Sequence, residues 1–137
     1  MSYQLHIVPP PFVDRAWKDG AHQLAKACAT SGGEVTGEQL KLLLSRGERC
    51  LLRIDLDGQA VGWAVTRIDA LPNVRALHVC ELYAPGGHWA HCFDLLADMA
   101  RASGCSEMRC SAGPAQARLY QRRLPWKPLY TTMSIEL

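Results

Sequence analysis

A carboxylate lies inside an apolar stretch of the chain at Glu81. It lies among Leu77, Val79, Leu82 and Tyr83. A carboxylate placed among such residues needs either a partner or a chemical role, because its burial is costly. A partner could be His78 or an arginine, and an edge position in a sheet would also lower the cost. The sequence leaves these alternatives open.

Six cysteines raise the question of disulfides or a metal site. They lie at positions 28, 50, 80, 92, 105 and 110. A chain of 137 residues can bury a core without bridges, and residues 1–6 lack the basic start and apolar core of a secretion signal. No C-x-x-C pair is present, so we predict thiols that behave as small hydrophobes. His88, His91 and Cys92 could offer metal ligands, but nothing else with ligand spacing accompanies them, and we predict no metal. We expect a cytoplasmic protein.

The charges are interspersed along the chain. The formal net charge is +2, from 15 basic and 13 acidic residues. This balance gives no electrostatic footprint for nucleic acid, and no apolar run approaches the roughly 20 residues that span a bilayer. We therefore expect neither nucleic acid nor a membrane as a partner. One local excess, at Arg118, Arg122, Arg123 and Lys127, indicates either a solvated helix face or a site for a phosphate-bearing ligand or acidic partner.

The elements of the first half follow from the spacing of apolar residues. Residues 3–8 alternate as a strand does, and the prolines at 9–11 end it. Apolar residues recur at 13, 17, 21, 24 and 28, which predicts one helix over 13–28. Thr36 and Gln39 have the spacing of a capping box at the start of a second helix, which Gly47 ends.

The second half changes period. Residues 50–56 and 61–68 predict two strands around the Asp57-Gly58 turn, and residues 74–84 predict a third strand. The remaining predicted elements are a helix from about Trp89 to Gly104, a strand over 107–111, a helix from Pro114 to about Leu124, and a last strand over 129–137. No repeat or linker divides the chain, so we expect one α+β domain over 1–137.

This order of elements resembles the GNAT acetyltransferase superfamily from end to end. Residues 95–105 look like the third helix of the family, which runs through an Ala-Arg pair to a glycine. Residues 117–123, with Leu119-Tyr120, look like its fourth helix, and residues 133–137 are similar to its closing strand. The resemblance implies a central mixed, mostly antiparallel sheet in the order β-α-α-β-β-β-α-β-α-β, with helices on both faces. The C-terminal strand region is shortened.

The resemblance also implies a site for acetyl-CoA. In the family, the strand that ends here near Ala84 splays away from the strand at 107–111, and the pantetheine chain pairs with exposed main-chain groups. The pyrophosphate rests on amides at the N-terminus of the next helix. The matching residues are Leu82, Tyr83 and Ala84 for the pantetheine chain, and Gly86, Gly87, His88 and Trp89 for the pyrophosphate. Without the resemblance, Pro-Gly-Gly is ordinary loop chemistry and Trp89 a core anchor of the helix.

Two catalytic roles come with the resemblance. A glutamate on the cofactor-bearing strand accepts a proton from the attacking amine, directly or through water, and Glu81 matches it. A tyrosine of the fourth helix protonates the departing thiolate, and Tyr120 matches it, with an ordinary pKa near ~10. The implied function is acyl-CoA-dependent N-acetyl transfer to an amine on a small molecule or protein. Tyr120 also fits a purely structural role as a packed helix aromatic.

The loop departs from the family signature, which is Arg or Gln, two residues, Gly, one residue, then Gly or Ala. In one register Gly87 takes the first glycine position and Trp89 the small position, and Ala84 stands in place of the Arg or Gln. In the other register Ala90 and Cys92 take those places.

Glycines followed by tryptophan, and a helix ending in Ala-Arg-x-x-Gly-Cys, resemble small GNAT-like proteins of tailed bacteriophages. The alternative function is therefore a non-catalytic GNAT-fold protein that binds a protein partner and has lost acetyl-CoA binding. The family resemblance further implies a homodimer.

Overall fold

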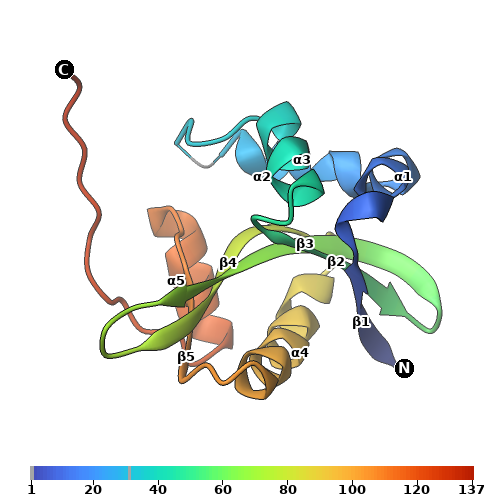
Figure 1. The fold of residues 1–137 in the computed structure, drawn as a ribbon. Coiled ribbons are helices and arrows are strands. Elements are labelled where there is room, and N and C mark those ends of the chain that lie inside the picture. The colour runs from blue at the N-terminus through green and yellow to red at the C-terminus, as the bar shows by residue number, and fades with distance from the viewer. Residues whose placement is uncertain (1, 31) are drawn as a thin grey trace.

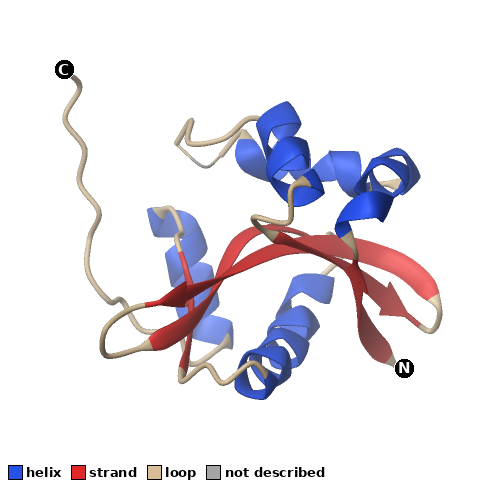
Figure 2. Ribbon diagram, viewed as in Figure 1, coloured by secondary structure: helices blue, strands red, loops and turns tan. Residues whose placement is uncertain are grey.

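The computed structural model describes residues 2–30 and 32–137, and it contains a five-stranded sheet between two layers of helices (Figures 1 and 2). The strands are β1 (Tyr3–Val8), β2 (Cys50–Leu56), β3 (Gln59–Ala70), β4 (Arg75–Tyr83) and β5 (Glu107–Cys110). They lie side by side in sequence order. The first four are antiparallel and β5 is parallel to β4. The predicted α+β class, with a mixed and mostly antiparallel sheet, is confirmed.

The helices divide between the two faces of the sheet. One face carries the 3-10 helices η1 (Pro10–Phe12) and η2 (Ala21–Leu24) with α1 (Val13–Asp19), α2 (Ala25–Cys28) and α3 (Gly37–Ser45). The other face carries α4 (His88–Ala102) and α5 (Pro114–Arg123). Helices on both faces were expected. The capping box at the start of α3 is also confirmed, because the Gln39 amide N–H donates to the Thr36 hydroxyl at 3.2 Å and the Thr36 N–H donates to the Gln39 side chain at 3.0 Å.

The predicted single helix over 13–28 was wrong. The chain breaks at Gly20, where φ is +145°. A Cβ at Gly20 would lie 3.2 Å from the indole nitrogen of Trp63, so the glycine lets the chain pass close to β3. The apolar spacing still identified the buried face, since Val13, Ala21, Leu24 and Cys28 all join the core below these helices. The helical spacing of the buried residues therefore continues across the break at Gly20, and the packing of the chain against β3 explains the break.

Each face of the sheet has its own core. The core under α1–α3 is built from residues such as Leu24, Leu40, Leu51 and Val65. The core under α4 and α5 includes Leu52, Ile54, Phe93, Leu96 and Tyr120. Alternate residues of β2 and β3 thus point to opposite cores, as the two-residue period of a strand requires.

The predicted last strand over 129–137 was wrong as a paired strand. After α5 the chain continues as an extended segment that joins no sheet within the described residues (Figure 1). Every residue from 127 to 137 is exposed. The alternation of side chains predicted an extended backbone, but pairing depends on a neighbouring strand, and this chain supplies none at that place.

Candidate functional site

β4 and β5 pair at one end and separate at the other. Their four paired positions run from Ala76–Glu107 to Val79–Cys110, where β5 ends. β4 continues to Tyr83, and beyond Val79 it pairs with β3 alone. The main chain at 80–83 therefore has no strand beside it on the β5 side among the described residues. The resemblance placed a divergence of the two strands at this point. An unpaired strand edge is able to receive an extended ligand.

A β-bulge sets which side chains line β4 at this point. The register with β3 shifts between Val65 and Thr66, so Val65 pairs with Glu81 and Thr66 with Val79, and Cys80 has no partner position. Such a bulge re-aims the side chains that follow it. Glu81 shares the face of its partner Val65, which belongs to the core under α1–α3.

Glu81 is buried and ion-paired. It is 5% exposed, and the Arg49 guanidinium donates to both of its carboxylate oxygens, at 2.8 and 3.4 Å. Burial raises the pKa of Glu81, while the positive charges of Arg49 and Arg67 act to lower it. The arginine partner is one of the alternatives that the sequence left open. The pair is compatible with a base of raised pKa, and it also accounts for the carboxylate without any catalytic role.

Tyr120 lies on the other face of the sheet, within an aromatic cluster. Its ring centroid is 5.3 Å from that of Trp89, 5.2 Å from that of Phe93 and 6.2 Å from that of Trp126. Its hydroxyl oxygen accepts a hydrogen bond of 2.7 Å from the Gln116 side chain. Burial raises the pKa of Tyr120, so the phenol keeps its proton at neutral pH. Glu81 and Tyr120 are thus not brought together, because they flank the sheet from opposite faces.

The loop between β4 and α4 is exposed, and two glycines with positive φ determine its backbone conformation. Gly86 and Gly87 have φ of +76° and +83°, which L side chains rarely adopt, and both are exposed. Gly87 precedes the 15-residue α4, and no side chain caps the first turn. The amide groups of that turn are the ones that attract anions. The Trp89 indole is turned toward Phe93 and Tyr120, so it packs between α4 and α5.

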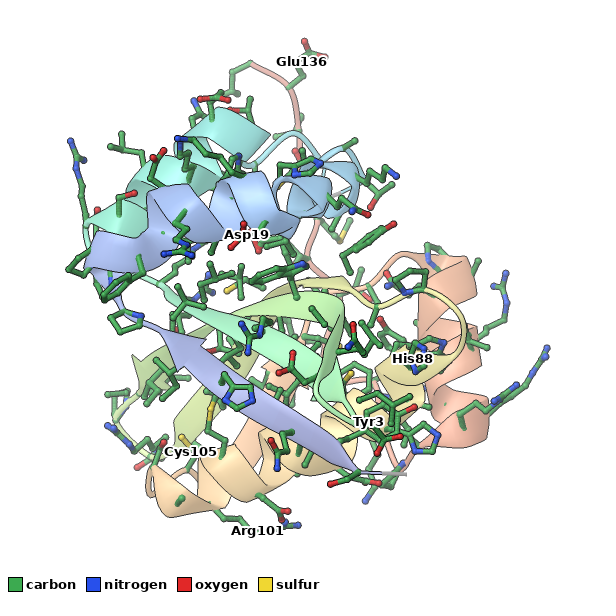
Figure 3. The ribbon with its side chains drawn as sticks, turned by 90° about the vertical axis from the view of Figure 1, so that its right-hand side faces the viewer. Tyr3, Asp19, His88, Arg101, Cys105 and Glu136 are labelled. Carbon is green, nitrogen blue, oxygen red and sulfur yellow. The ribbon has the colours of Figure 1, made fainter. Side chains whose placement is uncertain are left out.

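The start of α4 is fixed to β1. The Tyr3 hydroxyl shares a 2.8 Å hydrogen bond with Nδ1 of His88, and the Tyr3 ring stacks on His91 at 4.7 Å (Figure 3). The sequence prediction placed His88 at the pyrophosphate through its main chain, and this side-chain contact does not oppose that role. Tyr3 was missed, since a residue 85 positions away leaves no local signal.

The predicted pantetheine residues lie at the end of β4. Leu82 packs in the core under α4 and α5, and Tyr83 packs on the opposite core, where Lys26 lies 5.4 Å from its ring centroid. Ala84 is buried against Gly62 of β3. Their main chain is therefore held in place from both faces of the sheet.

Replacing Gly62 with alanine is expected to destabilise the protein, because a Cβ there would lie 2.6 Å from the Tyr83 carbonyl oxygen and 2.9 Å from the Ala84 Cβ. We expect the free energy of unfolding to fall by about 1–3 kcal/mol in chemical denaturation. Gly113 is the matched control, since a Cβ there meets nothing within 4 Å. Equal stability of the two variants would contradict the close approach of β3 to the end of β4.

The cysteines lie in or beside the cores. Cys28, Cys92 and Cys105 are buried, the other three are half-buried, and no pair of the six forms a disulfide. Burial raises the pKa of Cys80 and Cys110 to about 11 and that of Cys92 to about 12, so these thiols stay protonated. Within residues 2–30 and 32–137, no group of three acidic, histidine or cysteine side chains has the arrangement of a metal site.

The basic residues near the C-terminus are exposed and unneutralised. Among the described residues, no carboxylate lies within salt-bridge distance of Arg118, Arg122, Arg123 or Lys127. The first three lie on α5, which contains no acidic residue. This surface is suited to a phosphate-bearing ligand or an acidic partner, as the sequence suggested, and equally to solvent.

Besides Tyr3, sequence reasoning missed three further residues that shape the site. Arg49 precedes β2 and pairs with a residue 32 positions away. Trp126 joins the aromatic cluster from beyond the proline that ends α5. Gln116, one helical turn before Tyr120, is the exception with a local signal, because i and i+4 residues share a helix face.

Comparisons of structure find the same fold in solved acetyltransferases. A ribosomal-protein-alanine N-acetyltransferase from Brucella melitensis biovar Abortus is similar over 99% of this chain and 100% of its own, with a TM-score of 0.64 and 19% identity. Glucosamine-6-phosphate N-acetyltransferase from Arabidopsis thaliana is similar over 99% of both chains, with a TM-score of 0.64 and 16% identity. An aminoglycoside N-acetyltransferase in complex with CoA is similar over 99% of this chain and 95% of its own, with a TM-score of 0.63 and 12% identity.

The sequence comparisons are negative, as the chain matches no protein-family model and no curated protein matches its sequence. Among the described residues, no helix is both long and apolar enough to cross a membrane. The likeness to solved structures covers almost the whole chain, including β4 and β5. This chain therefore has the fold of the GNAT acetyltransferases.

Proposed function

We propose that this chain binds acetyl-CoA along the unpaired edge of β4, beside the end of β5, and transfers the acetyl group to an amine. The observation that carries the proposal is the early end of β5 at Cys110, which leaves the edge of β4 beyond Val79 without a strand on that side. The structural neighbours are acetyltransferases, which supports the same reading.

The residues present fit the proposed ligand. The free edge of β4 at 80–83 can pair with the amide groups of a pantetheine chain. Gly86 and Gly87 are exposed and have no side chain, so a pyrophosphate can approach the main chain before α4. The Trp89 indole packs against Phe93 and Tyr120 in the aromatic cluster.

Acetyl-CoA, when bound, would supply the acetyl group as a thioester. The amine nitrogen forms a bond to the carbonyl carbon, the carbon–sulfur bond breaks, and one proton leaves the amine while one reaches the sulfur. Tyr120 would give its proton to the sulfur. Its raised pKa keeps the phenol protonated, and in the hydrogen bond with Gln116 the hydroxyl oxygen accepts, so the phenol proton is not used in that bond. Glu81 would take the amine proton, and both groups would then exchange protons with solvent.

The base role of Glu81 requires a relay. Its side chain is 3% exposed and held by Arg49, so the amine would reach it through a water molecule. Burial strengthens the carboxylate as a base by raising its pKa, and Arg49 limits that rise. In this proposal the acceptor amine belongs to a small molecule or a protein.

A second candidate function rests on the aromatic cluster. Trp89 and Trp126 pack around Tyr120. Such an aromatic cluster can stabilise a surface that binds a partner, and this role does not require the Tyr120 hydroxyl. In this case the chain is a non-catalytic protein of the same fold that binds a protein partner and has lost acetyl-CoA binding.

Titration calorimetry with acetyl-CoA separates the two functions. We expect binding in the micromolar range, and we expect Gly87→Asp to weaken it by roughly 10-fold or more, because a carboxylate would replace open space next to the pyrophosphate. Gly87→Asn is the neutral counterpart and should bind more tightly than Gly87→Asp.

Gly58→Asp is the matched control for backbone strain. Gly58 has φ of +84° against +83° at Gly87, and a Cβ added at either glycine would meet nothing within 4 Å. This variant should bind acetyl-CoA as the native chain does. Absence of heat and of any thermal shift with the native chain at millimolar acetyl-CoA would reject the acetyltransferase and leave the partner-binding function.

A further inference from the structure

A cavity of about 440 Å³ lies between α1 and the β1 side of the sheet. Three of its lining residues form a row in register across three strands, namely His6 of β1, Arg53 of β2 and Trp63 of β3. None of the lining residues belongs to β4 or β5, so the cavity is separate from the proposed acetyl-CoA site. Its volume is within the range of small-molecule sites in proteins.

A buried carboxylate fixes the polar part of this row. Asp55 is 3% exposed, and the Arg53 guanidinium donates to both of its oxygens at 2.9 Å. Nε2 of His6 lies 3.1 Å from the same carboxylate. The fork uses Nε and Nη2 of Arg53, holds the plane of the guanidinium and leaves Nη1 outside this pair. Polar groups that are fixed before a ligand arrives lower the entropic cost of binding.

The α1 side of the cavity supplies one positive and one negative side chain, Arg15 and Asp19. They are one helical turn apart, yet among the described residues neither lies within salt-bridge distance of an opposite charge. Asp14 and Lys18 have the same spacing on the same helix and do pair, at 3.4 Å. Figure 3 shows Asp19 at the end of α1, above the sheet.

The stability of α1 does not account for Arg15 and Asp19. The dipole of a helix favours acidic residues in its first turn and basic residues in its last turn, and Asp14 and Lys18 follow this rule. Arg15 lies in the first turn and Asp19 is the last residue of α1, so both oppose it. An arginine that precedes an aspartate by four residues is also the weaker order for a helical ion pair. Side chains that break such a local rule are expected at functional sites.

The same cavity is lined by large apolar side chains that are exposed to solvent. Ile7 is 64% exposed and Phe12 is 57% exposed. Exposed apolar side chains that gather at one cavity offer a surface against which the apolar part of a ligand can be buried. The cavity therefore combines an apolar surface with fixed charges of both signs.

We propose that this cavity binds a zwitterionic α-amino acid with a large apolar side chain. The carboxylate of the ligand would lie at Arg15, its ammonium group at Asp19 and its side chain against Phe12. The arginine and aspartate charges at the cavity already balance, so a ligand that carries both signs matches them better than an anion or a cation does. This inference does not depend on acetyl transfer, and it can hold or fail independently of the proposed function.

Titration calorimetry with L-phenylalanine, without acetyl-CoA, tests this site. We expect a dissociation constant below about 1 mM. Two analogues separate the contributions of the charges, because 3-phenylpropanoate lacks the ammonium group and 2-phenylethylamine lacks the carboxylate. Each should bind at least about 10-fold more weakly than L-phenylalanine, since each leaves one charge of the cavity without its partner.

The double variant Arg15→Gln/Asp19→Asn should weaken the binding of L-phenylalanine at least about 10-fold. Asp14→Asn/Lys18→Gln is the matched control, because it removes the same two charges from neighbouring positions of α1 that do not line the cavity. This control should bind L-phenylalanine as the native chain does. Thermal unfolding separates a binding role from a structural one. Arg15→Gln/Asp19→Asn should unfold at the temperature of the native chain or above it, because both charges oppose the helix dipole.

Absence of heat with L-phenylalanine at about 20 mM would overturn the proposal. Equally tight binding of either analogue would also overturn it, because the site would then read only one charge. Native-like binding by Arg15→Gln/Asp19→Asn, or a lower unfolding temperature of that variant, would remove Arg15 and Asp19 from the site and the proposal with them. Acetyl-CoA binding should be the same in all these variants, so none of these results bears on the proposed function.

Discussion

Replacing Tyr120 with phenylalanine is expected to lower the rate of acetyl transfer by roughly 100-fold, the usual contribution of a general acid. The change removes the proton that would reach the departing sulfur and keeps the ring that packs against Trp89, Phe93 and Trp126. The rate is measured as CoA released from acetyl-CoA with lysine peptides and amino sugars as acceptors. Chromatography of CoA is preferable to a thiol reagent, since the chain carries six cysteines.

Tyr130→Phe is the matched control, because Tyr130 is 74% exposed in the segment after α5 and has no place in the site. It should leave the rate unchanged. Tyr120→Phe also loses the hydrogen bond from Gln116, so its unfolding free energy should fall by about 1 kcal/mol, which thermal unfolding can check. An unchanged rate in a folded Tyr120→Phe variant would remove the tyrosine from the mechanism. Because burial raises the pKa of Tyr120, its acid form should persist to a higher pH than that of an ordinary tyrosine.

Replacing Arg49 with methionine is expected to lower the free energy of unfolding by about 3–5 kcal/mol at pH 8, the usual cost of removing one partner of a buried ion pair. The change would leave the Glu81 carboxylate, 5% exposed, without its guanidinium. Arg46→Met is the matched control. The Arg46–Glu48 pair is exposed and 4.0 Å apart, so its loss should change stability by less than about 0.5 kcal/mol. Chemical denaturation measures both variants.

The pH dependence of this loss has a definite sign. The pKa of Glu81 is raised in the folded protein, so protonation favours folding, and that contribution is lost as pH rises through the folded pKa. Without Arg49, which acts to lower the pKa, the folded pKa rises further. The Arg49→Met variant should therefore recover stability as pH falls from 8 toward the ordinary pKa of glutamate. The double variant Arg49→Met/Glu81→Gln should be more stable at pH 8 than Arg49→Met, and a destabilisation of Arg49→Met that does not vary with pH would contradict this account of Glu81.

Apart from the break in the helix over 13–28 and the unpaired segment 129–137, the order of the elements could be predicted from the sequence, because helix and strand periods and turn residues are local properties. The capping box at Thr36, the turn at Asp57-Gly58 and the stop at Gly104 depend on residues a few positions apart, and the structure contains all three. The resemblance to acetyltransferases, carried by the order of elements and by residues 95–105, 117–123 and 133–137, gave the fold class correctly.

The tertiary structure decided the properties that depend on distant partners. Gly20 breaks a periodic helix because Trp63 packs against it, and the Glu81 carboxylate is neutralised by Arg49 from another element. Tyr120 and Glu81 fall on opposite faces of the sheet because a bulge at Cys80 re-aims β4. The alternation of side chains in 129–137 predicted an extended backbone. A paired strand also needs a neighbouring strand, and local spacing does not determine where that neighbour lies. Local periods act over a few residues, whereas pairing, burial and charge compensation act between residues that only folding brings together.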